Sequence, residues 1–216
     1  IPAVAIVDPE LMYSMPKGLT AATGMDALTH AIESYITPGA WVMSDMFELK
    51  AIEMIAQNLK AAVDNGKDVA AREAMSQAQY IAGMGFSNVG LGIVHSMAHP
   101  LGAFYDTPHG VANALLLPYV MEYNAESPAA PKYIHIAKAM GVDTTGMSEA
   151  EGVKAAIEAV KALSISINIP QKLHEINVKE EDIPALAVAA FNDVCTGGNP
   201  RPTSVADIEA LYHKAF

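Results

Sequence analysis

Apolar residues recur at intervals of three and four along most of this chain, the spacing that places side chains on one face of an α-helix. Ile52, Ile55 and Leu59 are an example. The segment 1–8 instead predicts a strand, with no partner strand following it. We therefore expect an all-α, multihelical fold with one short N-terminal strand, in which helices cover approximately residues 17–35, 41–63, 69–86, 111–123, 131–140, 148–165, 183–194 and 204–215.

The pattern is broken between residues 83 and 109. Four glycines in 83–92 predict close helix packing, close approach to a ligand, or a loose loop. Pro100 is expected to interrupt a short helix that carries two histidines. Thr107 and Pro108 then predict a new helix, with threonine as its N-cap and proline in its first turn. This start would place His109 in the opening turn.

Length and composition narrow the class of protein. The 216 residues fit one large domain or at most two small ones. A net charge of −11, with Arg72 and Arg201 as the two arginines, argues against nucleic-acid binding. No apolar run is long enough for a membrane span, and no secretory leader pattern begins the chain. Cys195 is the single cysteine, which rules out an intrachain disulfide and favours the cytoplasm.

Acidic and histidine side chains occur at helical spacing in two places. Asp26 and His30 are four residues apart, as are His95 and His99, so each pair lies on one helix face. His109 would point back toward His95 from the next helix. A transition metal takes three or four nitrogen and oxygen ligands, and three histidines with one carboxylate supply that set. The spacing therefore favours a mononuclear divalent metal site.

Ordinary structural roles are the competing interpretation of these histidines. A lone histidine on a helix is more often a core or surface residue than a ligand, and we interpret His135, His174 and His213 in that way. The clustered histidines differ because glycine and apolar residues flank them, where imidazoles without partners would be costly to bury. Two further classes stay open: a metal-dependent hydrolase with the same ligands, and a metal-free helical interaction module.

Several motifs carry a resemblance to a known family. They resemble the signatures of the iron-dependent, or group III, alcohol dehydrogenases, and the likeness spans the whole chain. Within that family the similarity is greatest to the lactaldehyde reductases, also called 1,2-propanediol oxidoreductases. The family motifs are found at residues 8–10, 23–33, 95–103 and 108–113, and the stretches similar to the lactaldehyde reductases are residues 35–41, 83–90 and 193–201.

The resemblance implies a role for each matching residue. His99 matches a histidine near the nicotinamide that is not a ligand, which makes it a catalytic candidate for proton relay or cofactor contact. Phe86 and Cys195 match positions that line the substrate pocket. The implied cofactors are Fe(II), with zinc possible in isolated protein, and NAD, with NADP not excluded. The implied metal ligands are Asp26, His30, His95 and His109.

The resemblance also implies a domain organisation. Family members have an N-terminal α/β nucleotide-binding domain followed by a helical metal domain, the C-terminal half of a dehydroquinate synthase-like fold. Residues 1–12 would be the end of the first domain and 13–216 the helical metal-binding catalytic domain. The family's GGGS phosphate loop is not in this sequence. We therefore expect hydride transfer between a small alcohol or diol and a nicotinamide, with the chain's own nucleotide-binding domain as partner and a homo-oligomeric assembly.

Overall fold

The computed structural model describes residues 3–216, and within them it is all-α, as the sequence predicts. A short 3-10 helix at Pro9–Met12 precedes the first α-helix, and further 3-10 turns connect some of the later ones. The described part of the chain contains the α-helices α1 (Lys17–Ile36), α2 (Val42–Asp64), α3 (Val69–Val89), α4 (Ile93–Tyr105), α5 (His109–Asn124), α6 (Tyr133–Ala139), α7 (Glu149–Ser166), α8 (Ile183–Phe191) and α9 (Val205–Ala215).

The expected N-terminal strand is wrong for the part of it that the structure describes. Residues 3–8 are exposed and form neither strand nor helix, while residues 1–2 lie outside the described residues. A strand is stable only when a neighbour accepts and donates its backbone hydrogen bonds. Residues 3–216 offer no such neighbour, so the apolar composition of this segment does not lead to a strand here.

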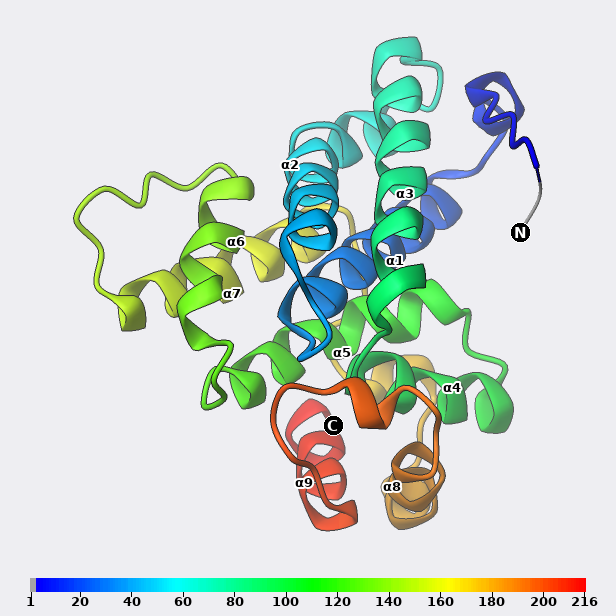
Figure 1. The fold of residues 1–216 in the computed structure, drawn as a ribbon. Helices are drawn as coiled ribbons and strands as arrows, with labels where there is room; N and C mark the ends of the chain where they lie inside the picture. The colour runs from blue at the N-terminus through cyan, green and yellow to red at the C-terminus, as the bar shows by residue number, and fades with distance from the viewer. Residues whose placement is uncertain (1–2) are drawn as a thin grey trace.

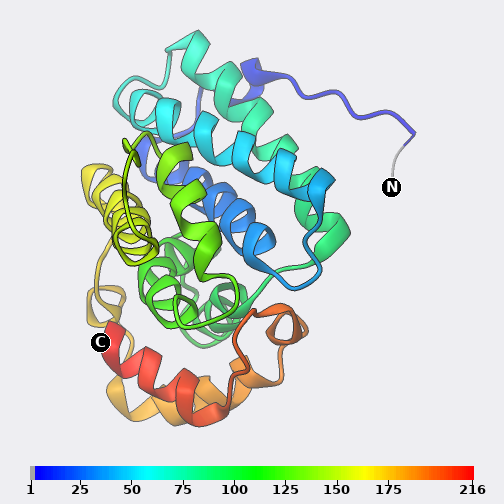
Figure 2. The same ribbon diagram turned by 60° about the vertical axis from the view of Figure 1, so that its left-hand side comes forward.

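A largely buried helix, α1, forms the centre of the molecule. It packs against α2 and α3 on one side and α5 on the other, while α8 and α9 pair beyond α4 (Figures 1 and 2). Between Thr20 and Ile36, α1 is buried at every position except exposed Thr23 and half-buried Asp26 and His30. Asp26 and His30 are one helical turn apart, and they are the two residues of this helix that the sequence predicts to bind a metal.

The glycine-rich segment and the first proline both differ from expectation. α3 continues through Gly83 and Gly85 to Val89. Close packing is confirmed at Gly85, where a Cβ would lie 1.8 Å from Oε1 of buried Glu48, but not at Gly90, which has open space around it. α4 runs through Pro100 to Tyr105 instead of ending there. Proline removes one backbone hydrogen bond, at about 3 kcal/mol, but complete burial of neighbouring Leu101 offsets this cost.

The start of α5 is one residue later than the sequence predicts. Pro108 is the N-cap, with a non-helical backbone, and His109 is the first helical residue. Thr107 does not cap the helix, since its buried hydroxyl has no hydrogen-bond partner. The expectation that His109 lies in the opening turn is confirmed. α5 also passes through Pro118 without ending.

Buried Arg72 of α3 holds the segment before α1 in place. Its guanidinium donates to the carbonyls of Met15 and Gly66 and to the Thr20 hydroxyl. These bonds fix the beginning of α1 relative to α3, the two helices that border the cleft described below. Among residues 3–216, none of the helices has both the length and the apolar character needed to cross a bilayer.

Candidate metal centre

Asp26 and His30 face an open cleft beside α1. The cavity has a volume of about 510 Å³ and is bordered by α1, α3 and the segment that precedes α1. The His30 ring stacks on Phe86 of α3, with ring centroids 4.5 Å apart and an angle of 16° between the planes. The structure thus brings Phe86, one of the two residues expected to line the substrate pocket, to the wall of this cleft.

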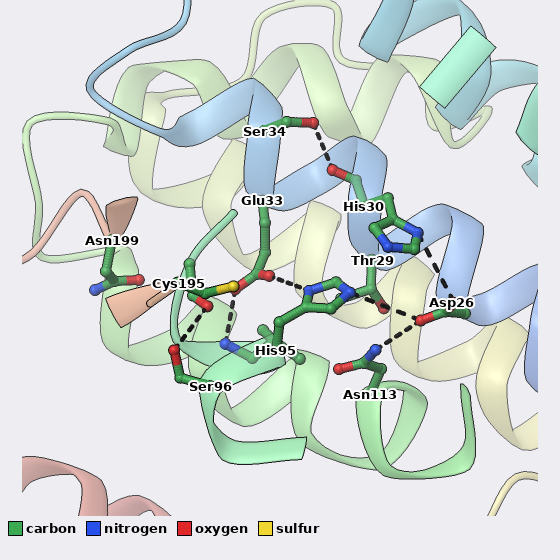
Figure 3. A network of polar contacts seen from close by, with 12 residues as sticks. Asp26, Thr29, His30, Glu33, Ser34, His95, Ser96, Asn113, Cys195 and Asn199 are labelled. Carbon is green, nitrogen blue, oxygen red and sulfur yellow. Dashed lines mark hydrogen bonds and ion pairs between the residues drawn. The ribbon is translucent and has the colours of Figure 1, made fainter. Parts of the chain in front are cut away.

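Two further histidines converge on Asp26 from other helices. Nε2 of His95, on α4, is 3.8 Å from Asp26 Oδ1, and Nε2 of His109, on α5, is 3.5 Å from the same oxygen. His30 Nδ1 is 3.9 Å from Asp26 Oδ2. Figure 3 shows the rings of His30 and His95 each in contact with Asp26. His95 and His109 therefore converge on one oxygen of Asp26, while His30, on the same helix as Asp26, approaches the other oxygen.

The geometry fits a metal ion. Ligands bound to one ion at about 2.1 Å lie about 3.0–3.4 Å apart, so separations of 3.5–3.9 Å need only a small contraction. One donor atom from each of Asp26, His95 and His109 lies within 4.8 Å of the others. Nε2 of His95 is buried and has no hydrogen-bond partner. An orphaned nitrogen of this kind is costly unless a further group binds it.

The surroundings of the histidines set their protonation. Burial lowers the pKa of His30 to about 4, and burial likewise lowers the pKa of His109, in each case against the opposing charge of Asp26. Both rings are therefore neutral at neutral pH, the state in which imidazole binds metals. Burial also disfavours charge on His95, but a hydrogen bond from its Nδ1 to Glu33 and the charge of that carboxylate raise its pKa above the usual value.

His99 lies beside the cluster but interacts elsewhere. Its ring stacks on His109 with centroids 5.4 Å apart, and its Nδ1 is 2.7 Å from Asp193 Oδ2. Asp193 also accepts a hydrogen bond from the backbone N–H of Cys195. His99 is thus oriented by a carboxylate that follows α8, and it is not in the group of donor atoms formed by Asp26, His95 and His109.

Cys195 lies away from the cleft wall that carries Phe86. In Figure 3 its sulfur is next to Glu33, on the far side of His95 from Asp26. Burial and the nearby charge of Asp193 raise the pKa of its thiol to about 12. The thiol is therefore protonated at neutral pH and is a poor nucleophile.

Sequence reasoning missed two residues that contact the cluster directly. Glu33 bonds to His95, and its signal was its position seven residues after Asp26, on the same face of one helix. Asn113 donates to Asp26 Oδ1 at 2.6 Å and lies four residues after His109, on the same helix. Asp193 is different, because 94 residues separate it from His99 and no local spacing connects them.

Comparison with known proteins agrees with this geometry. Residues 20–216 match the Fe-containing alcohol dehydrogenase family, C-terminal part. The chain therefore belongs to the Fe-containing alcohol dehydrogenase family.

Individual relatives show how much of a family member the chain represents. It is 59% identical to the lactaldehyde reductase of Escherichia coli (strain K12) and 46% identical to the NAD-dependent methanol dehydrogenase of Bacillus methanolicus, matching over 100% of this chain and 56% of each relative. The crystal structure of a 1,3-propanediol oxidoreductase superposes with a TM-score of 0.98 at 47% identity, again over 100% of this chain and 56% of that one. The chain thus spans little more than half the length of these relatives.

Proposed function

We propose that this chain is the metal-binding catalytic part of a dehydrogenase that transfers hydride between a small alcohol or diol and a nicotinamide cofactor. The observation that carries the proposal is the convergence of Asp26, His95 and His109 on one point, with a buried, unpartnered nitrogen on His95. The relatives of this chain include a lactaldehyde reductase and a 1,3-propanediol dehydrogenase, which supports a small alcohol as substrate.

Asp26, His30, His95 and His109 would hold a divalent cation. One carboxylate and three imidazoles suit Fe(II), and zinc binds such a set more tightly, so isolated protein can carry either metal. A bound cation of this kind withdraws electron density from an alcohol or carbonyl oxygen and so favours hydride removal or delivery. Asn113 keeps the Asp26 carboxylate oriented through its hydrogen bond to Oδ1.

His99 is the residue we assign to proton transfer or contact with the nicotinamide. Because Asp193 engages its Nδ1, Nε2 is the nitrogen left to exchange a proton with substrate or water. Its side chain is 42% exposed, so the ring is accessible from outside the helical bundle. Phe86 and the apolar cleft wall would keep water from the reacting carbon.

The remaining parts of the enzyme are also proposals. Residues 1–12 would be the end of an N-terminal nucleotide-binding domain and 13–216 the helical domain, which agrees with a match to 56% of the relatives' length. NAD is the expected cofactor, since one relative is named as NAD-dependent, and NADP is the alternative. The expected assembly is a homo-oligomer in the cytoplasm. The alternative of a metal-dependent hydrolase would use the same ligand types, but no observation favours it.

Substitution of the ligands tests the proposal in the intact protein. Asp26→Ala and His109→Ala should each abolish retention of a stoichiometric metal, measured by elemental analysis after chelation with EDTA and reloading with Fe(II). His99→Ala should keep the metal but slow formation of reduced nicotinamide, followed by absorbance with 1,2-propanediol and NAD. Equal metal loss in all three variants would contradict the division of roles. Metal retention without nicotinamide reduction in the unaltered protein would favour the hydrolase.

A further inference from the structure

Glu33 is a buried carboxylate on α1 whose two oxygens both accept hydrogen bonds from α4. Oε1 accepts from the backbone N–H of Val94 at 2.7 Å, and Oε2 is 2.6 Å from Nδ1 of His95 (Figure 3). The Glu33 side chain is only 2% exposed. Within residues 3–216, no lysine or arginine forms an ion pair with it. The groups that hold this carboxyl in place therefore come from α4.

The backbone at the start of α4 supplies part of this hold on Glu33. Gly92 is the N-cap and Val94 the second helical residue, so the carboxylate lies against the N–H groups of the first turn, where the helix dipole favours an anion. Gly92 also makes the approach possible, because a Cβ there would be 2.8 Å from Glu33 Oε1. The Glu33 side chain is thus held in one position by groups 61 and 62 residues away in sequence.

The geometry of the contact with Glu33 sets the tautomer of His95, because Oε1 already accepts from Val94 and a carboxylate oxygen is an acceptor, so Oε2 is placed to accept from Nδ1. This contact requires the hydrogen on Nδ1, which leaves the lone pair of the neutral ring on Nε2. Nε2 is the buried, unpartnered atom 3.8 Å from Asp26 Oδ1. We propose that Glu33 is a positioning residue that fixes the tautomer and ring orientation of His95 for metal binding, an inference that rests on the function proposed above.

Glu33→Gln in the intact protein tests this role. A glutamine has one oxygen and one NH₂ group, so it cannot accept hydrogen bonds from both the Val94 N–H and the His95 Nδ1–H. In metal-free protein labelled with ¹⁵N-histidine, at a pH high enough to keep the His95 ring neutral, NMR should show His95 protonated on Nδ1 before the substitution and a mixture of tautomers after it. Titration with Co²⁺, followed by its visible absorption, should show affinity weakened about 10- to 100-fold.

Glu48→Gln is the matched control, because Glu48 is equally buried but touches none of the ligand side chains; its Co²⁺ affinity should be unchanged. If Glu33→Gln lowers thermal stability but binds Co²⁺ as tightly as the unaltered protein, Glu33 is only structural and the proposal is overturned. It is also overturned if His95 of the unaltered protein carries its proton on Nε2.

A separate variant, Asp26→Ala, shows whether the proposed function itself fails. If Asp26→Ala leaves Co²⁺ binding intact, these residues do not form the metal site and the function proposed above fails. The positioning of His95 toward a metal then fails with it, even where the NMR spectra show that Glu33 sets the tautomer.

Discussion

Asp193 and His99 illustrate how one residue can control another from a distant part of the chain. The carboxylate engages Nδ1 of His99 at 2.7 Å and is anchored by the backbone N–H of Cys195. We expect Asp193→Asn to leave the metal content unchanged and to lower the rate of nicotinamide reduction by up to about 10²-fold, since general acid–base catalysis contributes on that scale. Asp143→Asn, at an exposed carboxylate, is the control and should be neutral. Metal loss in Asp193→Asn would refute this role.

Glu48 is expected to make the free energy of unfolding depend on pH. Burial raises the pKa of Glu48 to about 8, well above its ordinary value of 4.5. The hydrogen bonds around Ser34 also favour a protonated Glu48. Oγ of Ser34 carries one hydrogen but lies 2.5 Å from the carbonyl oxygen of His30 and 2.6 Å from Oε1 of Glu48, so one of these two contacts needs a hydrogen from another group. A protonated Glu48 can donate to Ser34, which then donates to His30.

The sign of the Glu48 effect follows from proton binding. Between about pH 4.5 and pH 8 the folded protein keeps a proton that the unfolded chain has lost, so Glu48 should make stability fall as pH rises through this window. Glu48→Gln should flatten that part of the profile and raise the free energy of unfolding at pH 7 by on the order of 2 kcal/mol. Urea denaturation at pH 5, 6, 7 and 8 measures both, and parallel profiles for the two proteins would contradict the assignment.

The sequence could identify residues of the site only where spacing is local. Asp26 and His30 were visible because they are four residues apart on one helix, and Glu33 was visible in principle on the same face. The resemblance supplied the division between His99 and the ligand set, which stays a prediction. Asp193 could not be found, because its contact with His99 exists only through the packing of α8 against α4.

At the scale of elements, the meeting of α5 with α1 places His109 next to Asp26. Gly110 follows His109 directly, and a Cβ on it would be 2.3 Å from the backbone oxygen of Ala22 on α1. Backbone cannot move aside as a side chain can, so Gly110→Ala should separate the two helices. We expect a loss of about 1–3 kcal/mol in the free energy of unfolding, together with weaker metal binding because His109 is displaced.

Gly18→Ala is the matched control on α1. A methyl group on Gly18 would have no neighbouring atom within 4 Å, so alanine there should be neutral or stabilise the helix by up to about 1 kcal/mol. Urea denaturation and Co²⁺ titration of both variants check the prediction. A stable, tightly binding Gly110→Ala variant would show that the α1–α5 contact does not determine the position of His109.

The helix boundaries predicted best are those set by residues close together in sequence. The expected capping box at Ser148 is present, since its hydroxyl accepts from Glu151 N–H and the Glu151 carboxylate accepts from Ser148 N–H. The prediction that α4 is interrupted at Pro100 was wrong, because burial of neighbouring Leu101 outweighs the local cost of the proline. The strand was wrong because strand pairing depends on a partner outside the local sequence.

At the scale of the whole molecule, the all-α fold was predictable because apolar periodicity extends through nearly the entire chain. The arrangement of the helices was not, since it depends on contacts such as those of α1 with α2, α3 and α5 (Figure 1). This arrangement gathers the proposed ligands from three helices beside a central, buried helix. The proposed nucleotide-binding domain would place the nicotinamide near these ligands.

X-ray absorption spectroscopy of the intact, Fe(II)-loaded protein, compared with its Asp26→Ala and His99→Ala variants, tests the central claim most directly. The account predicts one ion per chain with three imidazole nitrogens and a carboxylate oxygen at about 2.0–2.2 Å. This signal should be lost in Asp26→Ala and unchanged in His99→Ala. An ion that lacks imidazole ligands, or whose spectrum is the same without the Asp26 carboxylate, would contradict the account.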